Sequence, residues 1–202
     1  MNGNLLAAAL ALACATSPAM EHPPGALAAP AAQDPMVPAG HGTLRQDVIT
    51  VSLRDGPLLI KVAPLDEGII RLLAPDTWQR LHALAEVRRP DAEAAASEPE
   101  LFLVSFFSYQ PNTAFNPENL QISHQGRLLQ PVAIHPLTGG FGRPVLEQQD
   151  NQSAIYVFDG RIDYRQRFVV RYGATDSDDW TGIIPKLEVE RAKVRARAGG
   201  TG

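Results

Sequence analysis

The chain contains almost no cysteine: Cys14 is its single thiol in 202 residues. One cysteine excludes an intramolecular disulfide, a cysteine-based zinc site and a CxxC redox pair within one copy of the chain. Basic charge is also scarce, since the formal net charge is −4 and the isoelectric point is near 5.7. The chain therefore lacks the overall positive field that holds a phosphate backbone, and we expect no nucleic-acid partner.

Local catalytic and cofactor motifs are missing as well. The sequence has neither G-x-S-x-G nor S-x-x-K, and its five histidines show no HxH, HExxH or HxxxH spacing. The glycine-rich stretch at 138–142 has the spacing of neither a Walker loop nor a dinucleotide-binding fingerprint. The sequence thus predicts no enzyme, no cofactor and no metal site.

A short apolar run stands at the start of the chain. Residues 5–13, LLAAALALA, match the length of a signal-peptide core and fall well short of the roughly 20 residues that a spanning helix needs. The stretch before it, MNGN, carries no Lys or Arg, which departs from the usual signal-peptide pattern. We interpret residues 1–14 as a leader.

The end of this leader allows two kinds of processing. Ala11, Leu12, Ala13 and Cys14 resemble the lipobox of bacterial lipoproteins, a family that usually has Leu or Val where Ala11 stands. The resemblance implies that Cys14 is acylated and becomes the mature N-terminus, anchored by more than one chain in the bacterial envelope. The alternative is ordinary signal-peptidase cleavage after an A-x-A triplet, either Ala11 to Ala13 or Ala26 to Ala28, which would give a soluble periplasmic or secreted protein.

The next segment has the composition of a linker. Residues 15–42 contain six Pro and eight Ala with almost no large apolar side chain, so they bury too little surface to offset the entropy of ordering. Proline favours extended, semi-rigid conformers. Residues 15–45 are therefore predicted to be a disordered tether.

Alternating apolar and polar residues predict strands from residue 46 onward. An Asp-Gly turn at 55–56 joins two such runs, so residues 47–64 are predicted to form a hairpin. Residues 68–73 are predicted to be a third strand. Residues 101–109, LFLVSFFSY, are apolar on both faces, which indicates a strand in the middle of a covered sheet or one with a face open to a partner.

Further strands are predicted at 154–158 and 168–172, which repeat this pattern. Residues 119–134 read as strand, Gln-Gly turn and strand, and Pro131 should move the second strand to an edge or a bulge.

Two segments have helical periodicity instead. Residues 76–89 carry an apolar stripe, Asp76 and Gln79 have the form of a capping box, and Pro90 is expected to end the helix. Residues 91–100 are then predicted to be an exposed loop. A second helix is expected at about 180–197, with Pro185 tolerable only in its first turn.

Together these elements predict a mainly β fold. Seven or eight strands with a turn signal about every ten residues resemble a secreted bacterial immunoglobulin-like sandwich, a resemblance of layout that covers residues 46–173. The expected organisation is a leader (1–14), a tether (15–45), a sandwich domain with two helices (46–198) and a disordered tail (199–202).

A recognition loop is predicted at 109–117, where aromatic, Asn and Pro residues cluster. The candidate binding surface consists of Tyr109, Asn112, Phe115, Asn116 and Phe141.

Three functions remain open. The first is an extracytoplasmic, membrane-tethered, non-catalytic binding or assembly module whose partner is another envelope or surface protein. The second is an extracytoplasmic hydrolase or small-ligand-binding protein with a dispersed site at Tyr109, His124, Asp159 and Asp163. The third is a structural surface or filament subunit. The second function requires that these four residues converge in one pocket.

Overall fold

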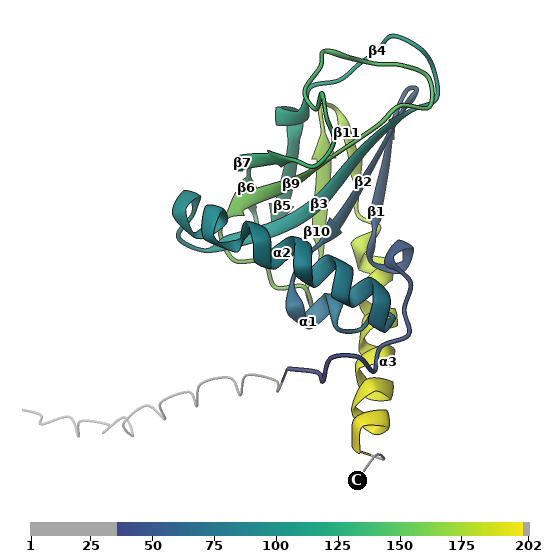
Figure 1. Ribbon diagram of the computed structural model, residues 1–202, viewed down its shortest axis with the longest axis vertical. Coiled ribbons are helices and arrows are strands. Elements are labelled where there is room, and N and C mark those ends of the chain that lie inside the picture. Colours follow the sequence, from purple (N-terminus) through teal and green to yellow (C-terminus); the bar gives the residue numbers. More distant parts are fainter. Residues whose placement is uncertain (1–35, 200–202) are drawn as a thin grey trace, which may run out of the picture. The chain divides into compact units, whose positions relative to one another are not determined.

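A five-stranded antiparallel sheet forms the centre of the protein in a computed structural model that describes residues 36–199 (Figure 1). Its strands lie side by side in the order β1-β2-β3-β9-β7. Their bounds are β1 Val51–Asp55, β2 Leu58–Pro64, β3 Pro99–Ser108, β7 Pro131–Pro136 and β9 Asn151–Asp159. The strand that is apolar on both faces, β3, is in the middle, as its sequence predicted.

A second, four-stranded sheet packs against the first. Its order is β11-β10-β5-β6, and the bounds are β5 Leu120–His124, β6 Arg127–Leu129, β10 Phe168–Tyr172 and β11 Thr175–Ser177. A small two-stranded sheet, β4 Thr113–Ala114 with β8 Val145–Leu146, ties together two loops at one end of the molecule. All strand pairs in the three sheets are antiparallel.

Aromatic side chains fill the space between the two large sheets. Even-numbered residues of β3 point inward, and Phe102 meets Phe168 of β10 edge-on, with 6.2 Å between ring centroids. Phe106 likewise lies 6.0 Å from the ring of Tyr172. Trp180, which is fully buried, stacks on Phe168 at 4.7 Å and closes one end of this core. Edge-to-face and offset contacts of this kind add to the gain from burial.

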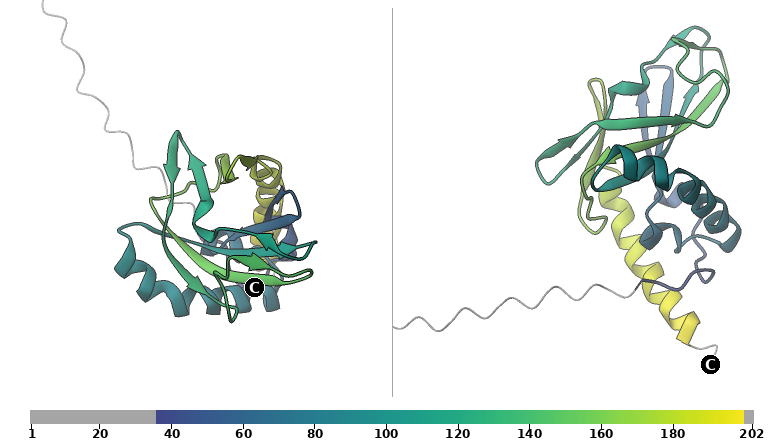
Figure 2. Two further views of the ribbon diagram at one scale, coloured as in Figure 1. Left: turned by 90° about the horizontal axis from the view of Figure 1, so that it is seen from above. Right: turned by 60° about the vertical axis from the view of Figure 1, so that its left-hand side comes forward.

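The helices lie outside the sheets (Figure 2). The α-helices are α1 Glu67–Ile70, α2 Pro75–Ala95 and α3 Trp180–Gly199, and two short 3-10 turns are η1 Gln46–Ile49 and η2 Pro117–Asn119. Helix α2 crosses the outer face of the five-stranded sheet over β3, β9 and β7, while α3 starts beneath β10. None of the helices in residues 36–199 is long and apolar enough to cross a bilayer.

Helix α2 is longer than predicted at both ends. It begins with Pro75 at its first position, so Asp76 lies inside the first turn and does not cap it. It continues through Pro90 to Ala95, which corrects the predicted loop at 91–100. Ala92 is fully buried, and this packing offsets the backbone hydrogen bond that Pro90 removes.

The predicted strand at 68–73 is wrong, because residues 67–70 form α1. The side chain of Asp66 accepts a hydrogen bond from the Ile69 N–H at 3.1 Å and caps this single turn. Ile69 and Ile70 are both fully buried, and a short run that is apolar throughout does not distinguish a strand from a buried turn.

The predicted tether and domain border also need correction, since residues 36–45 lie against the domain. Val37 is buried, and Leu44 forms a parallel bridge with Leu73. The buried carboxylate of Glu190 accepts hydrogen bonds from the N–H and hydroxyl of Thr43 at 3.0 and 2.9 Å. We call residues 37–45 the strap. The leader, the rest of the tether and residues 200–202 lie outside the described residues.

Several other expectations are confirmed. The hairpin spans 51–64, although its predicted first residues form η1, and the final helix begins at Trp180. Pro131 lies in the edge strand β7 beside a register shift, as predicted. Pro185, however, lies beyond the first turn of α3. The fold of residues 36–199 is mainly β with eleven strands, and the immunoglobulin-like strand order and count are not confirmed.

Candidate binding face

Helix α2 leaves part of the outer face of the five-stranded sheet uncovered. We call this part the open face; residues paired across its strands share one side of the sheet, because side chains alternate along each strand. It is made of Ser52, Arg54, Leu59, Lys61, Ser105, Phe107, Asn151 and Ser153. Each is at least partly exposed.

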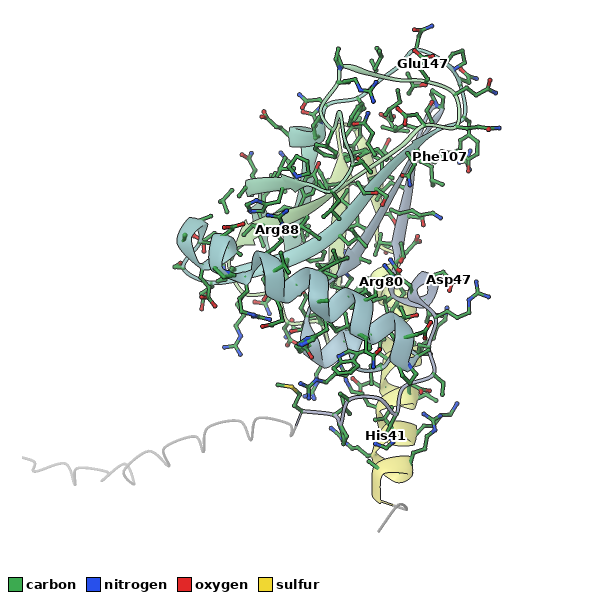
Figure 3. The ribbon with its side chains drawn as sticks, viewed as in Figure 1. His41, Asp47, Arg80, Arg88, Phe107 and Glu147 are labelled. Carbon is green, nitrogen blue, oxygen red and sulfur yellow. The ribbon has the colours of Figure 1, made fainter. Side chains whose placement is uncertain are left out.

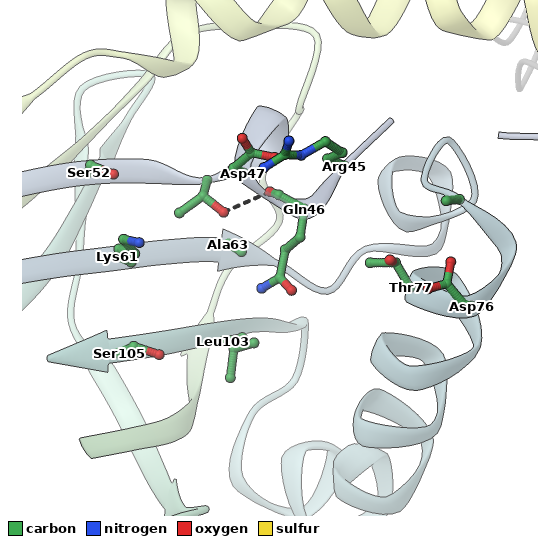
Figure 4. Close-up of a pocket in the computed structure, with 12 residues that line it drawn as sticks. Arg45, Gln46, Asp47, Ser52, Lys61, Ala63, Asp76, Thr77, Leu103 and Ser105 are labelled. Atoms are coloured by element: carbon green, nitrogen blue, oxygen red, sulfur yellow. Dashed lines mark hydrogen bonds and ion pairs between the residues drawn. The ribbon is translucent and has the colours of Figure 1, made fainter. Parts of the chain in front are cut away.

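A polar row crosses the open face over four strands. Ser52 pairs with Lys61, Lys61 with Ser105, and Ser105 with Ser153. The hydroxyls of Ser105 and Ser153 are hydrogen-bonded at 2.8 Å. Lys61 therefore projects between hydroxyl groups on both neighbouring strands, as Figure 4 shows for Ser52 and Ser105.

The next row, farther from α2, contains the apolar and aromatic side chains of the open face between a cation and an amide. Arg54 pairs with Leu59, and Leu59 with Phe107. The guanidinium of Arg54 lies 4.6 Å from the ring centroid of Tyr109, and that ring meets Phe107 edge-on at 4.9 Å. Tyr109 stays 43% exposed. Since these side chains hold one another in place, the row is ordered before any partner arrives.

A hollow of about 640 Å³ lies where the polar row meets the start of α2 (Figure 4). Its floor comes from β1, β2 and β3, and its walls come from η1 and the first turn of α2. The lining residues are Arg45, Gln46, Asp47, Thr50, Ser52, Lys61, Ala63, Ala74, Asp76, Thr77, Leu103 and Ser105.

Most polar groups at the wall of the hollow are held by other protein groups. Arg45 forms an ion pair with Asp47 at 3.0 Å, and Thr50 donates a hydrogen bond to the Gln46 carbonyl at 2.8 Å. The Gln46 side chain accepts a hydrogen bond from Arg80 at 2.6 Å, and Figure 3 shows Arg80 beside Asp47. Lys61, by contrast, makes no ion pair with any residue of 36–199. It is the cation of this site that stays available to a ligand.

The structure separates the residues of the predicted binding surface into exposed residues and residues that pack on the core. Tyr109 and Asn112 are exposed at the end of β3 and in the loop that follows. Asn116 is exposed too, but its side chain accepts the Glu118 N–H at 3.0 Å and caps η2.

The two phenylalanines of that predicted surface belong to the core side. Phe115 is 7% exposed and packs on Phe106 at 5.1 Å, while the partly buried Phe141 lies 6.4 Å from both rings. Pairing of β4 with β8 brings their two loops together. Of the predicted set, therefore, Tyr109 is the residue that joins the open face.

The four residues of the dispersed site do not converge. Tyr109 follows one end of β3 and Asp159 pairs with Pro99 at the other, so about 30 Å of strand separates them. His124 is buried, with Nδ1 donating to the Arg167 carbonyl and Nε2 accepting the Asp163 N–H, both at 3.1 Å. These contacts hold the loop between β9 and β10 against the end of β5 and leave neither ring nitrogen for a substrate.

A buried acidic group lies elsewhere, at the base of the core. Glu100 accepts hydrogen bonds from the Tyr164 hydroxyl at 2.7 Å and from the Ile162 N–H at 3.1 Å. Burial raises the pKa of Glu100 to about 7 despite these bonds, and nearby Asp66, whose own pKa is raised by burial, adds to the effect. Because both oxygens are occupied by the protein, we interpret this carboxyl as part of the fold.

No group of three or more His, Cys, Asp or Glu side chains in residues 36–199 is arranged to hold a metal ion. The sequence left open that the 101–109 strand has a face open to a partner, but it did not identify the residues of the open face, because polar residues at alternate positions of β1 and β2 look like any solvated strand face. Only the position of α2 shows which part of that face is left uncovered. Comparison of the chain with known protein families, with curated proteins and with solved structures gave no match.

Proposed function

We propose that the chain is an extracytoplasmic, membrane-tethered, non-catalytic binding or assembly module whose partner is another envelope or surface protein. The open face carries this proposal. It presents Leu59, Phe107 and the 43% exposed Tyr109 beside a polar row, on a sheet that is otherwise covered by α2. Aromatic side chains within a polar surround are typical of protein interfaces.

The position of the strap supports a tether at the end of the molecule opposite the β4–β8 loops. The strap lies against α1 and the far half of α3, where Arg197 donates to the His41 carbonyl at 2.6 Å. The β4–β8 loops lie at the other end, beyond the open face (Figure 1). The other end of the strap, Arg45, lines the hollow. A chain held through its N-terminal segment would be attached at the first residue of the strap, Val37, which leaves the open face accessible.

The chemistry of the hollow favours binding over catalysis. A serine or threonine nucleophile needs a base within hydrogen-bond reach. Within residues 36–199, Thr50 donates to a backbone carbonyl and Ser105 bonds to Ser153, and no hydroxyl of the hollow is hydrogen-bonded to a histidine, a lysine or a carboxylate. These groups suit recognition of a polar partner.

Site-specific photo-cross-linking in cells tests the proposal. We expect a benzophenone amino acid at Ser52, on the open face, to give one discrete protein adduct. The same substitution at Thr181, exposed on α3, should give none. If Ser52 gives no adduct, or if both positions give the same adducts, the open face is not the interface.

The hollow favours a second candidate, a small-ligand-binding protein, because its volume of about 640 Å³ lies in the range of ligand sites. Such a protein would give no protein adduct from Ser52. For either candidate, we propose that the domain is an immunoglobulin-like sandwich that serves in recognition. The two packed sheets and the pairing of the β4 and β8 loops at one end support this proposal.

A further inference from the structure

The open face carries positive charge within an acidic chain. Its two ionisable side chains are Lys61 and Arg54, and its other members are neutral. The chain as a whole has a net charge of −4. The face thus differs in sign from the protein that presents it, and this difference selects partners by charge.

Neither cation forms an ion pair with a residue of 36–199, although the carboxylates of Asp47 and Asp76 line the same hollow as Lys61. Arg45 at the wall of the hollow, and Arg88 and Arg171 elsewhere on the surface, each lie within 3.3 Å of a carboxylate oxygen. Lys61 and Arg54 have no such partner among residues 36–199, and Arg54 instead contacts the ring and hydroxyl of Tyr109. A partner that covers these two side chains must supply negative charge, because an uncompensated buried cation is costly.

The spacing of the two cations matches an extended chain. Lys61 pairs with Ser52, and Arg54 is two residues further along the same strand as Ser52, so the two cations are diagonal neighbours. Diagonal neighbours on adjacent strands lie about 7–8 Å apart. Side chains at alternate positions of an extended segment lie about 7 Å apart on one side.

We propose that the open face binds an extended acidic segment of a partner protein. Carboxylates at alternate positions of that segment pair with Lys61 and Arg54. Further along the segment, apolar residues that project from the same side as these carboxylates pack on Leu59, Phe107 and Tyr109. This inference rests on the proposed binding function and names the chemical class of the partner.

Peptide titration against the purified full chain tests it. The probe is a fluorescent ten-residue peptide, Ser-Glu-Ser-Glu-Ser-Val-Ser-Tyr-Ser-Val, whose Glu, Val and Tyr side chains lie on one side of an extended chain. Its neutral twin carries Gln in place of every Glu. At low ionic strength we expect the Glu peptide to bind at least about tenfold more tightly, with a loss of affinity as salt screens the charges.

Charge reversal locates the site. Lys61→Glu should weaken binding of the Glu peptide by about tenfold or more, and adding Arg54→Glu should weaken it further. Lys186→Glu makes the same change on exposed α3 and should stay within about twofold of the unaltered chain. Thermal unfolding of each variant checks that the fold is kept, which we expect because both open-face positions are exposed.

Three results would overturn the inference: no binding of the Glu peptide, equal binding of the twins, or equal losses from Lys61→Glu and Lys186→Glu. If any of these occurs while Ser52 still cross-links to a protein, the binding function stands and the partner segment is not acidic. If the cross-link is also absent, both proposals fail.

Discussion

At the scale of single residues, the partly buried position of Glu100 sets the pKa of its carboxyl. Its carboxyl lies at the base of the core beside Tyr164, Ile162 and Asp66, with Arg161 as the nearby cation. Burial raises its pKa because the charged form loses hydration. The folded chain therefore holds a proton on this group at pH values where the unfolded chain does not.

This difference predicts a pH-dependent stability. Glu100 binds more protons in the folded than in the unfolded state between its ordinary pKa of 4.5 and about 7. Its contribution is fully present below pH 4.5 and is lost as the pH rises through about 7. We expect the free energy of unfolding to fall by up to about 3 kcal/mol across this window on account of Glu100 alone.

Urea denaturation at pH 5, 6, 7 and 8 measures the effect. Glu100→Gln removes the titration, so its stability should depend less on pH than that of the unaltered chain. Glu98→Gln, at an exposed position just before β3, is the control and should keep the original slope. Parallel curves for the unaltered chain and Glu100→Gln would contradict the assignment.

Residue roles were the hardest part to predict from the sequence. Phe115 stands in a loop rich in Asn and Pro, yet its ring packs on Phe106 and on Phe141, and the buried His124 is hydrogen-bonded at two points to the loop between β9 and β10. The contact with Phe141 and the bonds to the backbone of residues 163 and 167 join parts of the chain that lie far apart in sequence. Lys61 is the opposite case, an ordinary strand lysine that becomes notable only because α2 begins beside the polar row that contains it.

At the scale of elements, local patterns predicted the sheets well. The central β3, the β1–β2 hairpin and the edge position of Pro131 follow from alternation, turn residues and the missing proline N–H. Helix ends were predicted less well, because Pro90 reads as a break while burial of Ala92 extends α2 past it. Packing of this kind is not visible in a window of sequence.

The strap depends on one glycine. A Cβ added at Gly42 would lie 2.2 Å from the backbone carbonyl carbon of Leu72. No side-chain atom can lie so close to a backbone carbon unless the backbone moves. Gly42→Ala must therefore push the strap away from the turn after α1. We expect a loss of about 3 kcal/mol in the free energy of unfolding, measured by urea denaturation.

Gly182→Ala is the matched control for this prediction. Gly182 lies in α3 with no atom within 4 Å of an added Cβ, so alanine there should be neutral or stabilise by up to about 1 kcal/mol. Equal effects of the two substitutions would show that the strap does not contribute to stability as its contacts indicate.

At the scale of the whole molecule, composition and patterning predicted a mainly β protein, and the structure has this character. The order of the strands was not predictable, since it depends on which strands pair in each sheet and on how the two sheets pack across the core. The strap was assigned to the tether because it contains proline and glycine. Its contacts come from Leu72 and Glu190, which lie 30 and more residues away in sequence.

The last prediction concerns the attachment of the molecule to a membrane. If Cys14 is acylated, the chain expressed in a bacterial host should sediment with membranes and resist extraction by carbonate, because more than one acyl chain gives stable anchoring. Mass spectrometry of the mature N-terminus should find Cys14 as the first residue, carrying the acyl groups. Cys14→Ala should move the chain to the soluble fraction, or leave the leader uncleaved.

Ser17→Ala is the control, since it changes a small residue three positions beyond the cysteine and should leave the chain in the membrane fraction. A mature N-terminus beyond Cys14, or an unmodified Cys14 as the first residue, would show ordinary signal-peptidase cleavage and contradict acylation. Processed Cys14→Ala that stays membrane-bound would exclude the anchor. Membrane association would then have to come from a partner, and the open face is the surface at which we would look for it.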